Sequence, residues 1–209
     1  MQSQSKLAEI RVSKLAVNIV GTLLTLMLCS AGVMVARMLP HHIPFAEWHA
    51  FAVLACFVVL LPLHEALHAV GLLVFANVPR CHIRFGVMWR ALMPYCHCTV
   101  PISVGAYRCM ALLPLWVTGA LSIASLLVFP ADCLGAFAGI AVAACVGDVW
   151  MVCRLRAFDD TLLVHDSPSE IGCDVLSAVT ELAGPSGPPN EGPATPVGQS
   201  DGPSGAHHR

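Results

Sequence analysis

Four long apolar stretches, separated by shorter segments that carry most of the charges, set the pattern of this chain. A helix needs roughly 20 predominantly apolar residues to cross the hydrocarbon core of a membrane. Each stretch reaches about that length, so the pattern predicts four transmembrane helices. Their expected bounds are about 15–36, 50–76, 109–131 and 133–153.

The composition agrees with this pattern. The 209-residue chain is 56% hydrophobic and only 11% charged, which is too apolar for an ordinary soluble domain. The first stretch is longer than the roughly 7–15 apolar residues of a secretory signal, and it ends at Arg37, so we interpret it as a retained helix. The sequence therefore predicts an integral membrane protein in contact with the lipid bilayer.

The basic residues indicate the orientation, because loops rich in Lys and Arg stay on the cytoplasmic side. Those before the first helix, between the second and third, and after the fourth are Lys6, Arg11, Lys14, Arg80, Arg84, Arg90, Arg108, Arg154 and Arg156. Only Arg37 borders the opposite side. We therefore expect a multi-pass protein of the cell membrane, with both termini and the segment 78–108 in the cytoplasm.

The segments outside the helices complete the expected fold. Residues 80–107 alternate and favour β-structure, with Gly86 and Pro94 as breaks, which predicts a short β-hairpin or small sheet on the cytosolic face. Residues 184–209 are rich in Pro, Gly and Ser and predict a disordered tail. The expected fold class is an all-α membrane protein of residues 1–183, with this hairpin between helices 2 and 3.

Three ionisable residues interrupt the second apolar stretch, in the sequence LPLHEALHAV. His64, Glu65 and His68 form a His-Glu-x-x-His pattern, and on a helix the i, i+4 spacing brings both imidazoles to one face. Both can then bind one Zn²⁺ while Glu65 serves as general base for a zinc-activated water. The plainer interpretation is a polar contact between helices. We favour the zinc site, because ionisable groups inside membrane helices are usually functional.

Two histidines leave a catalytic zinc site one protein ligand short. Asp148 is the one carboxylate inside another apolar stretch, and we expect it at nearly the same depth as His68. Gly147 beside it would allow the helices to approach closely. A carboxylate bonded to a neighbouring helix without metal is the alternative. We therefore predict His64, His68 and Asp148 as metal ligands and Glu65 as the catalytic residue.

A second cluster lies in the segment predicted as a hairpin. Cys96, His97 and Cys98, together with Cys81 and His82, could form a structural zinc site. However, adjacent strand residues point to opposite faces, so His97 would face away from the two cysteines. The spacing also differs from that of a zinc ribbon. We favour packing and substrate-side roles for Cys96, His97 and Cys98.

Several of these segments together resemble a known family. The stretches LHEALHA, FGVMWRALMPYCHCTVPISVGAYR, GDVWMVCRL and DDTLLVHDSPSEIG look like the zincin peptidases among bacterial multi-pass membrane proteins. That family is similar in layout to the intramembrane metalloproteases of the site-2 protease type. The resemblance spans roughly residues 55 to 175. It implies zinc ligation by His64, His68 and Asp148, activation of water by Glu65, and a bacterial membrane.

The expected function is therefore hydrolysis of peptide bonds by a membrane-embedded, zinc-dependent metalloendopeptidase. We expect a membrane or membrane-proximal protein as substrate and no nucleic acid as partner, and an edge strand of the 80–107 hairpin could hold the substrate extended. Two alternatives use the same ligands. One is a divalent-metal-binding or metal-transport membrane protein, and the other is a scaffold in which the metal locks two helices together. Glu65 distinguishes them, since neither alternative needs a base beside the ligands.

Overall fold

The computed structural model describes residues 5–88, 93–167 and 172–177. The chain divides into two units at residues 179 and 180, and the second unit, Thr180–Arg209, lies outside the described residues. The tail predicted for residues 184–209 therefore lies outside them as well.

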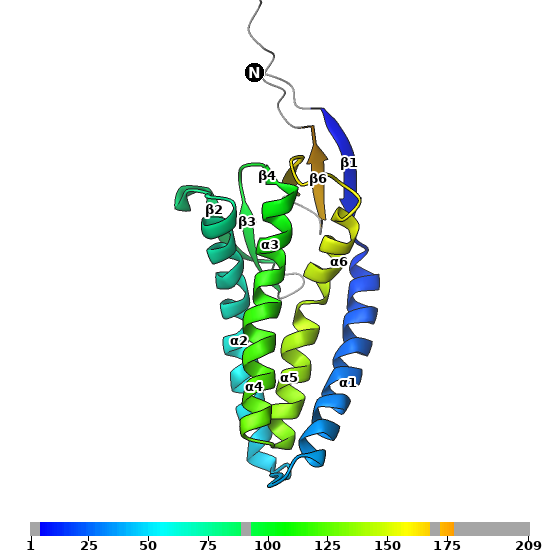
Figure 1. Cartoon of the computed structure of the whole chain (residues 1–209), viewed down its shortest axis with the longest axis vertical. Coiled ribbons are helices and arrows are strands. Elements are labelled where there is room, and N and C mark those ends of the chain that lie inside the picture. Colours follow the sequence, from blue (N-terminus) through cyan, green and yellow to red (C-terminus); the bar gives the residue numbers. More distant parts are fainter. Residues whose placement is uncertain (1–4, 89–92, 168–171, 178–209) are drawn as a thin grey trace, which may run out of the picture. The chain divides into compact units, whose positions relative to one another are not determined.

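Within these described residues, four helices are long and apolar enough to cross a membrane, as the sequence predicts. They run side by side, with the α1–α2 and α4–α5 connections at one end and the strands at the other (Figure 1). The third and fourth consist of two segments each. In chain order the segments are α1 (Lys14–Met38), α2 (Glu47–Phe75), α3 (Val104–Pro114), the π-helical turn η2 (Leu115–Gly119), α4 (Ala120–Val128), α5 (Asp132–Ala144) and α6 (Val146–Leu155).

The third helix begins five residues before its predicted start, because Arg108 lies inside the helix rather than at its border. Ser103 caps the first turn, where its side chain accepts a hydrogen bond from the backbone N–H of Ala106. The guanidinium of Arg108 then pairs with Asp160 and donates to the carbonyl of Leu155. A charge with these partners need not mark the end of a helix.

Glycines bring α1 and α5 into close contact. A Cβ added to Gly139 would lie 2.4 Å from the backbone nitrogen of Cys29, and one added to Gly135 would lie 2.4 Å from the carbonyl oxygen of Gly32. Any side chain at these positions would push the helices apart. Small residues at helix contacts are the usual device for packing in a membrane, where no hydrophobic force drives apolar helices together.

A buried carboxylate joins the same two helices at the end opposite the strands. Asp132 opens α5 and is 3% exposed. Its two oxygens accept hydrogen bonds of 3.1 and 3.0 Å from Arg37, at the end of α1. His42 lies 3.0 Å from one oxygen, and the backbone N–H of Phe45 donates to the other. This cluster fixes the α1–α2 connection against α5.

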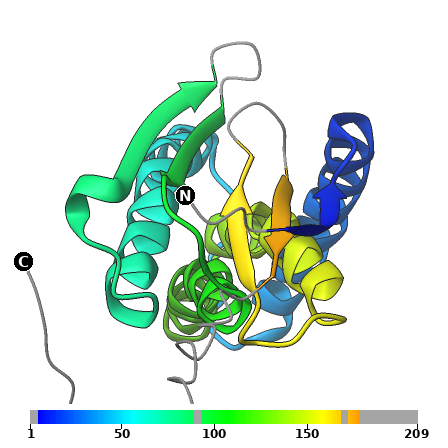
Figure 2. The same cartoon turned by 90° about the horizontal axis from the view of Figure 1, so that it is seen from above.

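The predicted hairpin is present. Strands β2 (Ile83–Met88) and β3 (Met93–Cys98) pair antiparallel, with Arg84 opposite His97 and Phe85 opposite Cys96. The hairpin follows a short 3-10 turn, η1 (Arg80–His82). Seen from the strand end, it lies over α2 (Figure 2).

A second sheet corrects the all-α fold class, because the described residues are mostly helical but form four further strands. The sheet is antiparallel throughout, in the order β1-β6-β5-β4. Its strands are β1 (Lys6–Arg11), β4 (Ile102–Ser103), β5 (Leu163–Asp166) and β6 (Gly172–Leu176). The sheet packs on the ends of α3 and α6 around a core of Ile10, Val104, Met151, Leu155, Val164, Cys173 and Val175. This core anchors the segment after α6 beside the predicted site.

Candidate metal centre

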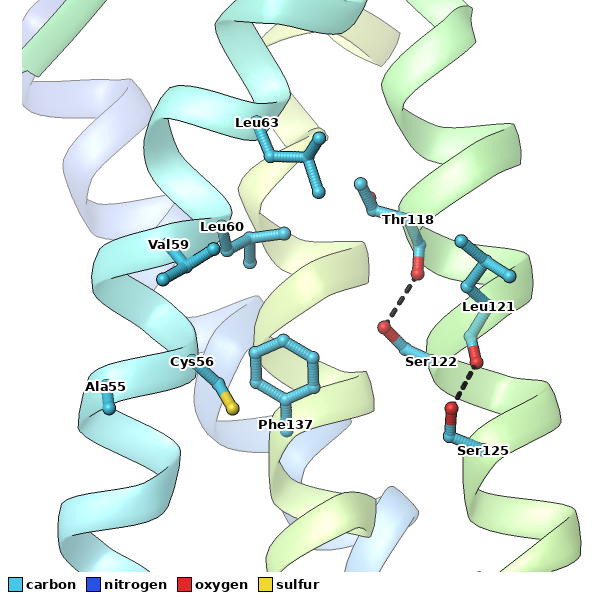
Figure 3. Close-up of a pocket in the computed structure, with 10 residues that line it drawn as sticks. All are labelled: Ala55, Cys56, Val59, Leu60, Leu63, Thr118, Leu121, Ser122, Ser125 and Phe137. Carbon is cyan, nitrogen blue, oxygen red and sulfur yellow. Dashed lines mark hydrogen bonds between the residues drawn. The ribbon is translucent and has the colours of Figure 1, made fainter.

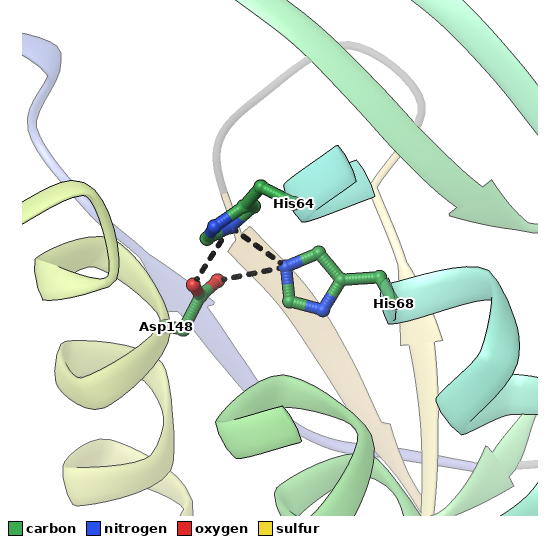
Figure 4. Close-up of side chains that lie close together, drawn as sticks. All are labelled: His64, His68 and Asp148. Atoms are coloured by element: carbon green, nitrogen blue, oxygen red, sulfur yellow. Dashed lines mark hydrogen bonds and ion pairs between the residues drawn. The ribbon is translucent and has the colours of Figure 1, made fainter. Parts of the chain in front are cut away.

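His64 and His68 lie one turn apart on α2, and both side chains point to the interior of the helix bundle. Both residues are buried, at 9% and 7% exposure. Their Nε2 atoms face each other at 3.1 Å (Figure 4). One Nε2 can donate to the other only if it carries the ring proton. If both rings carry their proton on Nδ1 instead, the two Nε2 lone pairs face each other and can share a third partner.

Asp148 meets both histidines from α6. Its Oδ2 lies 3.2 Å from Nε2 of His64, and its Oδ1 lies 3.4 Å from Nε2 of His68. The carboxylate follows a break between α5 and α6 at Cys145, whose backbone N–H turns back to the carbonyl of Val142. This break sets the direction in which α6 leaves, and with it the position of Asp148 against α2.

The distances within this group fit a tetrahedral zinc ion. Zinc binds imidazole nitrogen and carboxylate oxygen at about 2.0–2.1 Å, so two such ligands of a tetrahedral ion lie about 3.3 Å apart. The two Nε2 atoms lie 3.1 Å apart, Oδ2 of Asp148 lies 3.2 Å from that of His64, and Oδ1 lies 3.4 Å from that of His68. Each pair of residues therefore has ligand atoms at about this separation, although the two contacts of Asp148 use different oxygens. Moreover, Oδ2 of Asp148 is buried and accepts no hydrogen bond of good geometry from the described residues. His64, His68 and Asp148 are therefore a group that can hold a metal.

The far nitrogen of each histidine also has a partner. Nδ1 of His68 lies 3.3 Å from the carbonyl oxygen of Met110 on α3. Nδ1 of His64 lies 3.9 Å from the thiol of Cys145. A carbonyl only accepts, so the Met110 contact places the proton of His68 on Nδ1 and leaves its Nε2 lone pair for a metal. The Cys145 thiol donates to the carbonyl of Ala141, which leaves its sulfur to accept from Nδ1 of His64 in the same way. The sequence analysis missed both partners. Cys145 could have been considered from the sequence, because its thiol lies only three residues before Asp148, whereas the Met110 carbonyl belongs to the backbone and leaves no trace in the sequence.

A glycine does bring two helices together at the site, but it is a different glycine from the predicted Gly147. Gly147 faces open space, because a Cβ added there would meet nothing within 4 Å. The close approach occurs instead at Gly71, where a Cβ would lie 2.8 Å from the Cα of Met110. Gly71 is one turn beyond His68, so α3 touches α2 beside the ligands. The role predicted for Gly147 is wrong and belongs to Gly71.

Glu65 lies next to the ligand group without belonging to it. The backbone N–H of Cys96 on β3 interacts with its carboxylate. On the same strand edge, the N–H of Cys98 donates to Oδ2 of Asp166 at 3.2 Å, as expected for residues two apart on a strand. Both N–H groups that β3 directs away from β2 therefore have carboxylate partners. The outer edge of β3 therefore faces Glu65 and Asp166, and pairing of an extended substrate with the other edge strand, β2, stays a prediction.

The two cysteines of the hairpin pack in the interior. Cys98 is buried and Cys96 partly buried in a cluster with Leu72 and Val78 at the end of α2. Burial raises the pKa of the Cys96 thiol to about 12, so it is protonated at neutral pH. His97 points elsewhere, with its Nδ1 3.7 Å from Asp166. The packing role predicted for Cys96 and Cys98 is confirmed.

An apolar groove lies along α2 (Figure 3). Its volume is about 380 Å³, and it lies between α2 and α4 with Phe137 of α5 on its wall. Leu63, the residue before His64, lines it on one side. Hydroxyl groups line the other side, where Thr118 donates to the carbonyl of Pro114 and Ser122 to that of Thr118. The groove therefore has mainly apolar walls at the level of the membrane helices.

Comparison with known protein families assigns the chain. A family model described as "Putative zincin peptidase" matches residues 57–163, about half of the chain. The matched region includes His64, Glu65, His68 and Asp148. The protein therefore belongs to this family of zincin peptidases, and membership implies a metal. No curated protein and no solved structure matches the chain.

Proposed function

We propose that the protein is a membrane-embedded, zinc-dependent metalloendopeptidase with His64, His68 and Asp148 as zinc ligands and Glu65 as catalytic base. The observation that carries this proposal is the convergence of three ligand atoms from α2 and α6, all within 4.8 Å of one another. Membership of the zincin family supports it. Zinc is preferred over harder cations, because two of the three ligand atoms are imidazole nitrogens.

Each residue has a defined task in peptide hydrolysis. His64, His68 and Asp148 would hold the metal, three protein ligands being the number usual in catalytic zinc sites. When bound, zinc would supply a water of lowered pKa and a Lewis acid for the scissile carbonyl. Glu65 takes the proton from that water and passes it to the leaving amine. The N–H of Cys96 keeps the Glu65 carboxylate in place for this transfer.

We further propose that the protein is multi-pass in the cell membrane, with both termini and the strands on the cytoplasmic side. Large apolar side chains exposed on α1 and α2, such as Leu23, Leu26, Phe51 and Leu54, support contact with lipid. The distribution of basic residues supports the orientation. The ligand group then lies within the bilayer near its cytoplasmic side.

A membrane protein is the proposed substrate. The groove between α2 and α4 supports this, because its walls are mainly apolar and Leu63, the residue before His64, lines it. A substrate bound in this groove would approach from within the bilayer. One wall of the groove carries the hydroxyl groups of Thr118, Ser122 and Ser125. Such small hydroxyl-bearing residues are common where one helix packs against another in a membrane.

A metal-binding or metal-transporting membrane protein would use the same three ligands. Glu65 argues against it, because this carboxylate lies beside the group, is held by β3 and is not itself a member of the group. A transport or structural site has no need for such a base. The same feature argues against a scaffold in which metal only joins α2 to α6.

Glu65→Gln tests the proposal. The purified zinc-loaded variant should keep stoichiometric zinc and lose peptide cleavage by about 10²–10⁴-fold, the usual contribution of a general base. Glu47→Gln is the matched control, because Glu47 is an exposed residue in the first turn of the same helix. It should leave both zinc and cleavage unchanged. Undiminished cleavage by Glu65→Gln would refute the proposed role of Glu65.

A further inference from the structure

The carbonyl of Met110 reaches His68 because of the residue four positions further along α3. In an α-helix the carbonyl of residue i accepts a hydrogen bond from the N–H of residue i+4. For Met110 that residue is Pro114, which has no N–H. The next N–H, that of Leu115, donates to the carbonyl of Leu112. The Met110 carbonyl is therefore left for Nδ1 of His68, 3.3 Å away.

The distance between the Met110 carbonyl and His68 depends on Gly71. His68 and Gly71 are three residues apart on α2 and so share a face. The Cα of Met110 would lie only 2.8 Å from a Cβ at Gly71. Real Cβ atoms do not approach other atoms so closely, so an alanine at this position would move α3 outward. The Met110 carbonyl would then leave hydrogen-bonding distance of His68.

The contact matters for the metal group because it acts on the other ring nitrogen. A proton held on Nδ1 by Met110 leaves the Nε2 lone pair directed at His64 and Asp148. The hydrogen bond also fixes the orientation of the ring. Ligating histidines usually donate in this way to a carboxylate or a backbone carbonyl, and loss of the partner weakens metal binding.

We propose that Pro114 is a positioning residue of the zinc centre: its missing N–H reserves the Met110 carbonyl for His68, and Gly71 sets the distance. The inference rests on the proposed function only in that His68 binds zinc. It adds a reason for a proline within the third membrane helix, directly before the π-helical turn Leu115–Gly119. Displaced backbone hydrogen bonds of this kind often occur at functional sites.

Two changes at position 114 separate the missing N–H from the proline ring. Pro114→Ala restores an N–H that competes for the Met110 carbonyl, so zinc affinity should fall by about 10–100-fold in a chelator competition with the purified protein. Replacement of Pro114 by lactic acid, through an ester bond, removes the ring but supplies no N–H. That variant should keep the affinity of the unmodified protein.

Gly71→Ala tests the distance independently and should also weaken zinc binding by about tenfold or more. Gly147→Ala is its control, because Gly147 lies beside Asp148 and has room for a Cβ. A second readout follows the hydrogen bond itself. The Nδ1–H signal of His68 in ¹⁵N NMR of the zinc-loaded protein should shift and exchange faster in Pro114→Ala and Gly71→Ala, but not in the lactic acid variant or in Gly147→Ala.

The outcomes are distinct. Unchanged affinity and an unchanged His68 signal in Pro114→Ala would overturn the inference and leave the proposed function standing. An equal loss in the lactic acid variant would also overturn it, because the ring rather than the N–H would then be responsible. Failure of the unmodified protein to bind zinc would overturn both proposals. Should Pro114→Ala fail to fold, equal zinc affinities of Gly71→Ala and Gly147→Ala would be the overturning result.

Discussion

Asp148→Asn removes the charge of the proposed third ligand while it keeps the shape of the side chain. Structural zinc sites bind with apparent free energies of about 10–16 kcal/mol, shared among four ligands, so one ligand contributes roughly 3–4 kcal/mol. Both oxygens of Asp148 lie within 3.4 Å of a histidine Nε2 atom, in line with the separation expected between zinc ligands. The loss should therefore weaken zinc binding by about 10²–10³-fold.

The assay is a competition between the purified protein and a zinc chelator of known affinity, and Asp132→Asn is the matched control. Asp132 is also a buried carboxylate, but it holds Arg37 at the opposite end of the helices. Asp132→Asn should keep zinc affinity and lower the free energy of unfolding by about 2 kcal/mol, because charge-assisted hydrogen bonds are lost. Zinc binding by Asp148→Asn as tight as that of the unmodified protein would refute its role as a ligand.

Two further predictions concern the sheet and the helix packing. Burial raises the pKa of Asp166, so the folded state binds the proton of this carboxyl more tightly than the unfolded state does. The resulting contribution to the free energy of unfolding is present in full below about pH 4, the ordinary pKa of Asp. It is lost as the pH rises through the raised pKa of the folded state. Asp166→Asn should remove this slope from the free energy of unfolding measured by denaturant titration at several pH values, and parallel pH profiles would contradict the reasoning. Gly139→Ala should cost about 1–3 kcal/mol in the same measurement, because its Cβ would meet the backbone of Cys29 at 2.4 Å. Gly147→Ala, where a Cβ meets nothing, should cost nothing, and equal effects of the two changes would count against the packing argument.

The four helices that are long and apolar enough to cross a membrane could be predicted from sequence, because length and apolar character are local properties. The ligand group illustrates the same point. The i, i+4 spacing places His64 and His68 on one face of any helix, and counting residues from the helix end gives the depth of Asp148.

The four-stranded sheet could not be predicted in this way. Strand β1 pairs with β6, more than 160 residues away in the chain, and a short strand carries little signal without its partner. The choice between Gly71 and Gly147 failed for a related reason. Which glycine meets a neighbouring helix depends on how the helices are rotated, and this follows from the packing of the whole bundle. Backbone partners such as the Met110 carbonyl also have no side-chain signal.

The central claim is a zinc centre built from two histidines and one aspartate, and X-ray absorption of the purified zinc-loaded protein tests it most directly. The account predicts one zinc per chain, with only nitrogen and oxygen neighbours at about 2.0–2.1 Å, and a changed set of neighbours in Asp148→Asn. A sulfur neighbour at about 2.3 Å would instead locate the metal at cysteines such as Cys96 and Cys98. That result, or the absence of stoichiometric zinc, would contradict the account.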